Sequence, residues 1–230
     1  MTVDPPAYNI KLNKIIELNV RLIRVEPVDM KITLGSILES LSSLCWIGQM
    51  APYLREGYRV RAIGTIERLD KLLKESISSN LKSEAGEYVV SELSRSSVVN
   101  TLHYSDIPIA ELFKEQISGN PGFDFFTVNG DIILFGEAKY LSGRNAYSSA
   151  CEQINRFALE RRDLADIPDL KDFISSAALE KAAAGERGFI AGFSTTSMSN
   201  DALERHIIEN AHYIALPKDK EIICVAVDMP

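Results

Sequence analysis

The chain contains little cysteine, little histidine and no long apolar run. Its 230 residues include three cysteines and three histidines, none in a CxxC pair or a Cys–His group with zinc-ligand spacing, which argues against a structural zinc site. The cysteines (Cys45, Cys151 and Cys224) are most simply buried, reduced thiols. No stretch approaches the ~20 apolar residues of a membrane span, and the N-terminus lacks a signal-peptide pattern. We therefore expect a cytoplasmic protein without a membrane partner.

A basic excess is also missing. The chain has 25 Lys and Arg against 32 Asp and Glu, a net charge of -7 and a pI near 5.1. Proteins that bind nucleic acid unaided usually carry more positive than negative charge. The acidic balance therefore argues against autonomous nucleic-acid binding, but it suits a divalent metal site, because carboxylates are the ligands of such ions.

Two common catalytic motifs are absent as well. The sequence contains neither a GxSxG nor a Walker pattern, which disfavours a serine hydrolase or a nucleotidase. Residues 194–199 are rich in hydroxyls and precede a predicted helix, where they could bind a phosphate. Capping of that helix by Ser199 or Asn200 explains the same residues with fewer assumptions.

The order of patterns along the chain predicts an α/β fold. Residues 8–33 predict two or three strands that are interrupted at Pro27, and residues 35–43 and 62–79 predict helices. A polar stretch near residues 78–86 marks the expected boundary between an N-terminal α+β region, 1–80, of unknown role and a second domain, 81–230. The second domain should contain helices at 86–99, 106–117, 146–165 and 200–212, a hairpin at 123–140, and strands at 187–193 and 221–228.

The hairpin carries the functional prediction. Two apolar stretches flank Asn129-Gly130, a pair typical of a two-residue type I′ turn. With the residues next to this turn opposite each other, Asp124 faces Phe135 and lies diagonally across from Glu137, roughly 7–8 Å away at the backbone. Because side chains alternate along a strand, Asp124, Glu137 and Lys139 should share one face.

Two carboxylates and an ammonium group at the end of apolar strands suit phosphodiester hydrolysis. Neighbouring carboxylates repel each other unless a cation offsets them, and Mg²⁺ or Mn²⁺, bound by Asp124 and Glu137, would serve. Lys139 would orient the attacking water or stabilise the transition state. The alternative is an ordinary ion pair between Glu137 and Lys139, with Asp124 capping a turn.

These residues resemble the motif of the PD-(D/E)xK phosphodiesterase superfamily, which includes restriction endonucleases, junction resolvases and RecB-type nucleases. The motif reads Gly122-Phe-Asp124, then twelve residues, then Glu137-Ala-Lys139. Phe123 takes the place of the usual proline. The resemblance covers roughly residues 84–228 and implies a restriction-endonuclease-like core, with a mixed central sheet flanked by helices, that hydrolyses DNA.

The resemblance also implies further site residues. The family tends to place a Glu on the helix before the hairpin: Glu87 is the first choice, as a third metal ligand, and Glu92 is the competitor, because it borders the apolar stripe. A solvated carboxylate near a helix start is equally compatible with either. Gln153, followed by Phe157, resembles the helix Gln of RecB-like members and implies a further catalytic residue.

Arginines offer candidate contacts to nucleic acid. Arg144 and Arg156 are the predicted phosphate-binding residues, with Arg161 and Arg162 as possible additions to the same stripe. Charged helix faces are usually only solvated, which is the alternative for all four.

A narrower resemblance concerns the HamA-type nuclease subunits of the Hachiman antiphage defence system. It rests on chain length, the late position of the motif and the closing strand at 222–229. It implies a helicase partner that controls access to DNA, which would accommodate the acidic charge. Two other possibilities stay open: a catalytically silent domain that serves as a binding subunit, and a nuclease that acts on RNA. Endonucleolytic and exonucleolytic cleavage are not distinguished.

Overall fold

A single mixed sheet runs through the molecule. The computed structural model describes residues 8–77, 83–114, 122–218 and 220–229. Within them the sheet has seven strands in the order β1-β2-β7-β6-β5-β4-β3. Strands β2, β7, β6 and β5 are parallel, whereas β1, β4 and β3 are antiparallel to their neighbours. The strands are β1 (Tyr8–Glu17), β2 (Val20–Pro27), β3 (Ser105–Asp106), β4 (Phe125–Asn129), β5 (Ile132–Lys139), β6 (Arg187–Thr195) and β7 (Ile222–Asp228).

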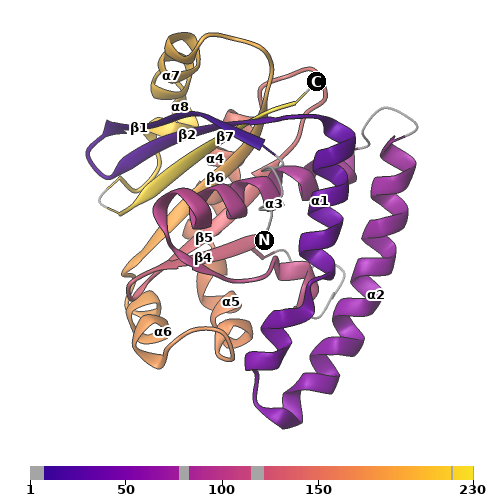
Figure 1. Ribbon diagram of the computed structural model, residues 1–230. Coiled ribbons are helices and arrows are strands. Elements are labelled where there is room, and N and C mark those ends of the chain that lie inside the picture. The colour runs from indigo at the N-terminus through magenta and orange to yellow at the C-terminus, as the bar shows by residue number, and fades with distance from the viewer. Residues whose placement is uncertain (1–7, 78–82, 115–121, 219, 230) are drawn as a thin grey trace.

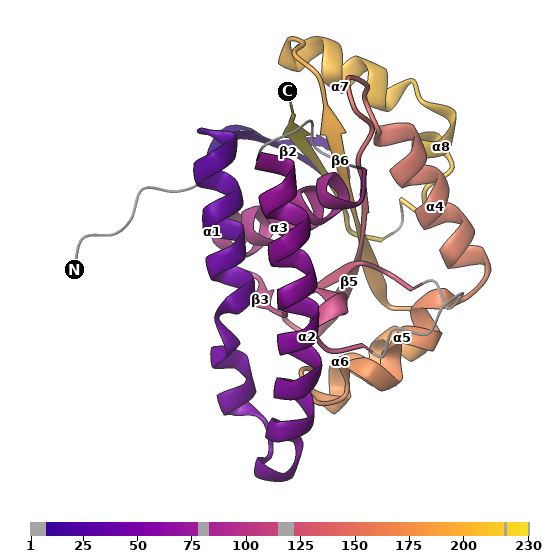
Figure 2. The same ribbon diagram turned by 90° about the vertical axis from the view of Figure 1, so that its right-hand side faces the viewer.

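Helices cover both faces of this sheet (Figures 1 and 2). One layer contains α1 (Met30–Ser42), η1 (Leu44–Gln49), α2 (Pro52–Ile77) and α3 (Ser83–Leu102); the other contains α4 (Tyr147–Leu159), α5 (Arg162–Leu170), α6 (Ser176–Ala183), α7 (Asn200–Ile208) and α8 (Ala211–Ile214). A short 3₁₀ turn, η2 (Ala110–Leu112), precedes β4. The predicted α/β class, with a mixed central sheet flanked by helices, is confirmed. No helix in the described residues is long and apolar enough to cross a membrane.

Two hydrophobic cores fill the space between the sheet and its helical layers. The central strands are apolar on both faces, as expected of strands covered on both sides. On β5, Phe135 packs into the core with Ile154 of α4, whereas Leu134 and Ala138 pack into the core with Val89 of α3. This alternation decides which helical layer each polar side chain of β5 faces.

Helix α3 lies directly against the end of β5. A Cβ atom added to Gly86 would overlap the ring of Tyr140, the residue that follows β5. One added to Gly192 of β6 would lie 2.5 Å from Ser94 Oγ of α3. The glycines therefore allow a close approach that brings the first turn of α3 next to Lys139.

The first 80 residues contribute to the same sheet. Strand β2 pairs with β7, with Arg24 opposite Ala226, and the core beneath α3 includes both Leu34 of α1 and Leu73 of α2. Part of the polar stretch expected to separate two domains, residues 78–82, lies outside the described residues.

Several predicted elements have different bounds. The helix expected at 106–117 is wrong: β3 ends at Asp106 and only η2 follows, because Pro108 disfavours a helical conformation at Ile107, while residues 115–117 lie outside the described chain. The helix expected at 146–165 ends at Leu159, since Arg161 has a left-handed φ of 57°. The helix at 200–212 is divided where Asn210 caps α8.

The burial expected for the cysteines is confirmed for two of them. Cys151 and Cys224 are buried, and all three thiols are free. The prediction for Cys45 is wrong, because this side chain is exposed on η1.

Candidate active site

The predicted hairpin forms, but with a different turn. Asn129 pairs with Ile132, so the turn residues are Gly130 and Asp131 rather than Asn129 and Gly130. Of these two only Gly130 has a positive φ, 59°, which matches a type II′ turn with Gly first rather than type I′. The predicted register is therefore wrong by two residues.

The corrected register brings the two carboxylates closer than predicted. Phe125 pairs with Gly136, so Asp124 lies beside Glu137 instead of Phe135. The Asp124 amide donates to Gly136 O at 2.9 Å, and its Oδ2 accepts from the Ala138 amide at 2.8 Å. A shift of two residues leaves every side chain on its predicted face, because strands alternate with a period of two.

The carboxylate of Glu137 is fully buried and incompletely hydrogen-bonded. Its side chain is 0% exposed, and Oε1 lies 2.8 Å from Lys139 Nζ. Oε2 has no hydrogen-bond partner in the described chain. Burial and the charge of Asp124 raise the pKa of Glu137 well above its usual value, against the lowering effect of Lys139. This carboxylate therefore lacks the compensation that a buried negative charge needs.

Asp124 and Lys139 complete the core of the site. Burial raises the pKa of Asp124, although Lys139 and the Ala138 amide act in the opposite direction. Burial alone would lower the pKa of Lys139, but the carboxylates of Glu137, Asp124 and Glu87 outweigh it and raise this pKa. The Lys139 ammonium is thus the shared counter-charge of three carboxylates, and the site has an excess of negative charge.

This excess fits a divalent cation. Mg²⁺ prefers oxygen ligands and is commonly held by one or two carboxylates, with water and substrate oxygens in the other positions. Asp124 and the unsatisfied Oε2 of Glu137 offer that pair. In the described part of the chain, no group of three or more His, Cys, Asp or Glu side chains is arranged to hold a metal ion.

Of the two glutamates considered on α3, Glu87 lies at the site. Its Oε1 is 3.9 Å from Lys139 Nζ, and burial raises its pKa, opposed by Lys139 and reinforced by Asp124. Glu92 is instead bound elsewhere: its Oε1 accepts from Arg95 Nη2 at 2.6 Å and from Ser40 Oγ at 2.8 Å. A metal-binding role for Glu87 stays a prediction.

The other candidate residues make no contact with the carboxylates. Gln153 is half-buried on α4, and its side chain forms no hydrogen bond to another described residue. Arg144 is exposed in the loop between β5 and α4. Arg156 is exposed on α4, with its guanidinium 5.3 Å from the centre of the Phe157 ring. Their roles in catalysis and nucleic-acid binding stay predictions.

The structure adds an acidic residue that the sequence did not reveal. Burial and the charge of Asp124 raise the pKa of Glu111, on η2, to about 8. Its Oε2 has no hydrogen-bond partner in the described residues. The Ala110 amide next to it donates to Asp124 O at 2.9 Å. No short-range pattern signals Glu111, because its proximity to Asp124 depends on how η2 packs.

A second unpredicted group, Lys114 with Asp166, positions the chain before Asp124. Asp166 Oδ2 accepts from the Phe123 amide at 2.9 Å, and Oδ1 lies 2.6 Å from Lys114 Nζ. A Cβ atom at Gly122 would lie 2.5 Å from both Lys114 Nζ and Asp166 Oδ1. Gly122 therefore leaves room for the Lys114–Asp166 ion pair, and a larger residue would displace the ends of these two side chains.

Comparisons with protein-family models, curated proteins and solved structures find no match for this chain. The functional assignment therefore rests on the residues and geometry of the site itself.

Proposed function

We propose that this protein is a metal-dependent nuclease with a restriction-endonuclease-like core of the PD-(D/E)xK type. The observation that carries the proposal is the fully buried Glu137 carboxylate, which lies beside Asp124 with one oxygen unsatisfied. Strongly perturbed acids with a specific charged partner are typical of catalytic sites. A carboxylate kept only for stability would be expected to have its hydrogen bonds satisfied.

Each residue of the site has a role in phosphodiester hydrolysis. Asp124 and Glu137 hold Mg²⁺ or Mn²⁺, with Glu87 as a further candidate ligand. An ion bound there supplies charge neutralisation for the phosphodiester and activation of water. Lys139 remains protonated beside Glu137 and donates to the attacking water or to a phosphate oxygen. Gln153 is proposed to assist from α4.

The proposed substrate is DNA, delivered by another protein. A net charge of -7 weakens unassisted binding to a polyanion without preventing it. A helicase partner that presents DNA to the site would remove this difficulty, as the resemblance to Hachiman nuclease subunits implies. We place the activity in antiphage defence or DNA processing in the cytoplasm.

A cleavage assay with near-isosteric variants tests the assignment. Asp124→Asn and Glu137→Gln each remove one proposed ligand charge and should reduce Mg²⁺- or Mn²⁺-dependent plasmid cleavage by about a hundredfold or more, because a catalytic metal contributes several kcal/mol. The matched control is Asp131→Asn, in the turn of the same hairpin, where the carboxylate lies 3.3 Å from Lys181 Nζ. It should cleave like the wild type.

The substrate panel separates the remaining alternatives. Plasmid, linear duplex, single-stranded DNA and RNA are compared under identical conditions, with EDTA as the metal-free control. Preferential cleavage of RNA would reassign the substrate. Cleavage that is equal in wild type, Asp124→Asn and Glu137→Gln would overturn the proposed site.

A further inference from the structure

The loop that follows Lys139 lies at the edge where the parallel strands β5, β6, β7 and β2 end. Open α/β sheets bind ligands at this carboxyl edge. The loop comprises residues 140–146, and a neighbouring loop, residues 196–199, follows β6.

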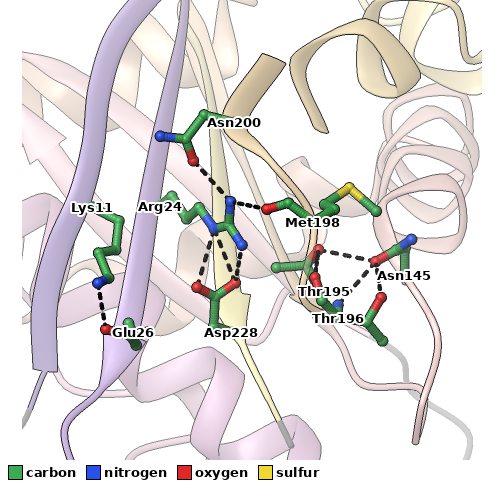
Figure 3. A network of polar contacts seen from close by, with 9 residues as sticks. All are labelled: Lys11, Arg24, Glu26, Asn145, Thr195, Thr196, Met198, Asn200 and Asp228. Atoms are coloured by element: carbon green, nitrogen blue, oxygen red, sulfur yellow. Dashed lines mark hydrogen bonds and ion pairs between the residues drawn. The ribbon is translucent and has the colours of Figure 1, made fainter. Parts of the chain in front are cut away.

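Asn145 joins the two loops. Its Oδ1 accepts hydrogen bonds from Thr195 Oγ1 at 2.9 Å, Thr196 N at 3.0 Å and Thr196 Oγ1 at 3.2 Å (Figure 3). A carbonyl oxygen has two lone pairs, so three donors saturate it. Asn145 therefore has an internal role, and its oxygen is not available to a ligand.

Ser194 holds the same loop at both ends. The Leu141 amide donates to Ser194 Oγ at 3.0 Å, and the Ala146 amide donates to Ser194 O at 2.9 Å. Between these points the chain turns at Gly143, which has a φ of 64°. Arg144 is exposed in this short segment, so it projects from a loop that is held on both sides.

Arg24 supports the second loop from the N-terminal part of the chain. It is 7% exposed, and its Nη2 lies 2.9 Å from Asp228 Oδ1. Its Nη1 donates to Met198 O at 2.7 Å and to Asn200 Oδ1 at 2.8 Å. Figure 3 shows these contacts beside those of Asn145 as a separate group, so Arg24 holds the loop after β6 while Asn145 links that loop to the one after Lys139.

The guanidinium group of Arg144 makes no ion pair or hydrogen bond with the rest of the described chain. Arg24 and Arg95, in contrast, are paired with carboxylates. Guanidinium groups bind phosphate through two parallel hydrogen bonds. An uncompensated arginine on a loop that is held at both ends, five residues after Lys139, therefore suits a phosphate next to the reacting one.

We propose that Arg144 binds the phosphate backbone beside the scissile bond and that Asn145 is a positioning residue that sets the loop for this contact. Arg24 holds the neighbouring loop, residues 196–199, to which Asn145 is bonded through Thr196. This inference rests on the proposed nuclease function. Through Arg24, the first 80 residues help to hold a loop at the edge of the sheet where substrate would bind.

The test is a binding measurement that needs no cleavage. Fluorescence anisotropy gives the dissociation constant of a fluorescein-labelled DNA duplex in Ca²⁺, at several salt concentrations. Arg144→Gln should weaken binding about 3- to 10-fold and reduce the salt dependence by about one phosphate contact. Asn145→Ala removes no charge, yet it should produce the same two changes because it displaces Arg144.

Further variants separate positioning from general damage. Thr195→Val removes one donor to Asn145 and should change binding in the same direction as Asn145→Ala. Arg144→Gln/Asn145→Ala should bind no more weakly than Arg144→Gln, since the two act through one contact. Arg59→Gln, with the same charge change on the exposed face of α2, should bind like the wild type.

Several results would overturn the inference: no measurable DNA binding, an unchanged salt dependence in Asn145→Ala, or additive effects in the double variant. Each is distinguishable from failure of the proposed function, which is decided by cleavage with Asp124→Asn. If that variant is inactive and Asn145→Ala binds normally, only the positioning role is lost.

Discussion

Glu92 on α3 and Glu137 on β5 are both almost fully buried, at 2% and 0% exposure, yet their surroundings differ. Glu92 accepts from Arg95 through both of its oxygens, at 2.6 and 2.8 Å, and also from Ser40. Glu137 has a single ion pair, to Lys139, and shares that ammonium with Asp124 and Glu87. The hydrogen-bonding capacity of the Glu92 carboxylate is therefore filled by neighbouring side chains, whereas that of Glu137 is not.

This difference separates a structural charge from a candidate functional one. A buried ion pair is tolerated when hydrogen bonds satisfy both partners, and removing one partner is then costly. A buried carboxylate next to another carboxylate is destabilising without an added cation. The buried carboxylate of Glu137 destabilises the fold in this way. A destabilising charge of this kind is expected where it is needed for binding or chemistry.

The largest expected difference in stability is between Glu92→Gln and Glu137→Gln. Glu92→Gln leaves the buried Arg95 without its main counter-charge and should lower the free energy of unfolding by about 3 kcal/mol. Glu137→Gln removes a poorly compensated charge and should leave the stability of the metal-free protein equal or higher. Urea unfolding of both variants measures this. A greater loss in Glu137→Gln would contradict the comparison.

A smaller effect is expected in the pH dependence of stability. Burial raises the folded-state pKa of Glu137 above its usual 4.5, so the stabilising contribution of this group is complete below pH 4.5 and is lost as pH rises through the folded pKa. The metal-free protein should therefore lose stability with rising pH by more than Glu137→Gln does. Unfolding series from pH 4.5 upward measure this difference, and parallel slopes in the two proteins would count against it.

Local patterns predicted the hairpin and the shared face of its polar residues. Two short apolar stretches on either side of a glycine turn are enough to identify two paired strands. The exact register was not predictable in the same way, because Asn129-Gly130 and Gly130-Asp131 both suit a two-residue turn and differ in which φ is positive. The error of two residues still placed Asp124, Glu137 and Lys139 on one face, because a shift by an even number of residues does not change the face to which a side chain points.

Other features depend on tertiary contacts that no local pattern reveals. Glu111 becomes a neighbour of Asp124 only because η2 packs against the start of β4. The choice between Glu87 and Glu92 depended on where Gly86 allows α3 to meet Tyr140. Asp166 reaches the Phe123 amide across 43 positions in the sequence. Sequence spacing gives no direct information about any of these contacts.

The central claim, that Asp124 and Glu137 hold a divalent cation, is tested most directly by Mn²⁺ binding. Electron paramagnetic resonance measures free Mn²⁺ during titration of the wild type, Glu137→Gln and the matched buried-glutamate control Glu92→Gln. We predict saturable binding in the wild type, retained binding in folded Glu92→Gln, and binding weakened at least tenfold in Glu137→Gln. Equal Mn²⁺ affinity in the wild type and Glu137→Gln would contradict the claim.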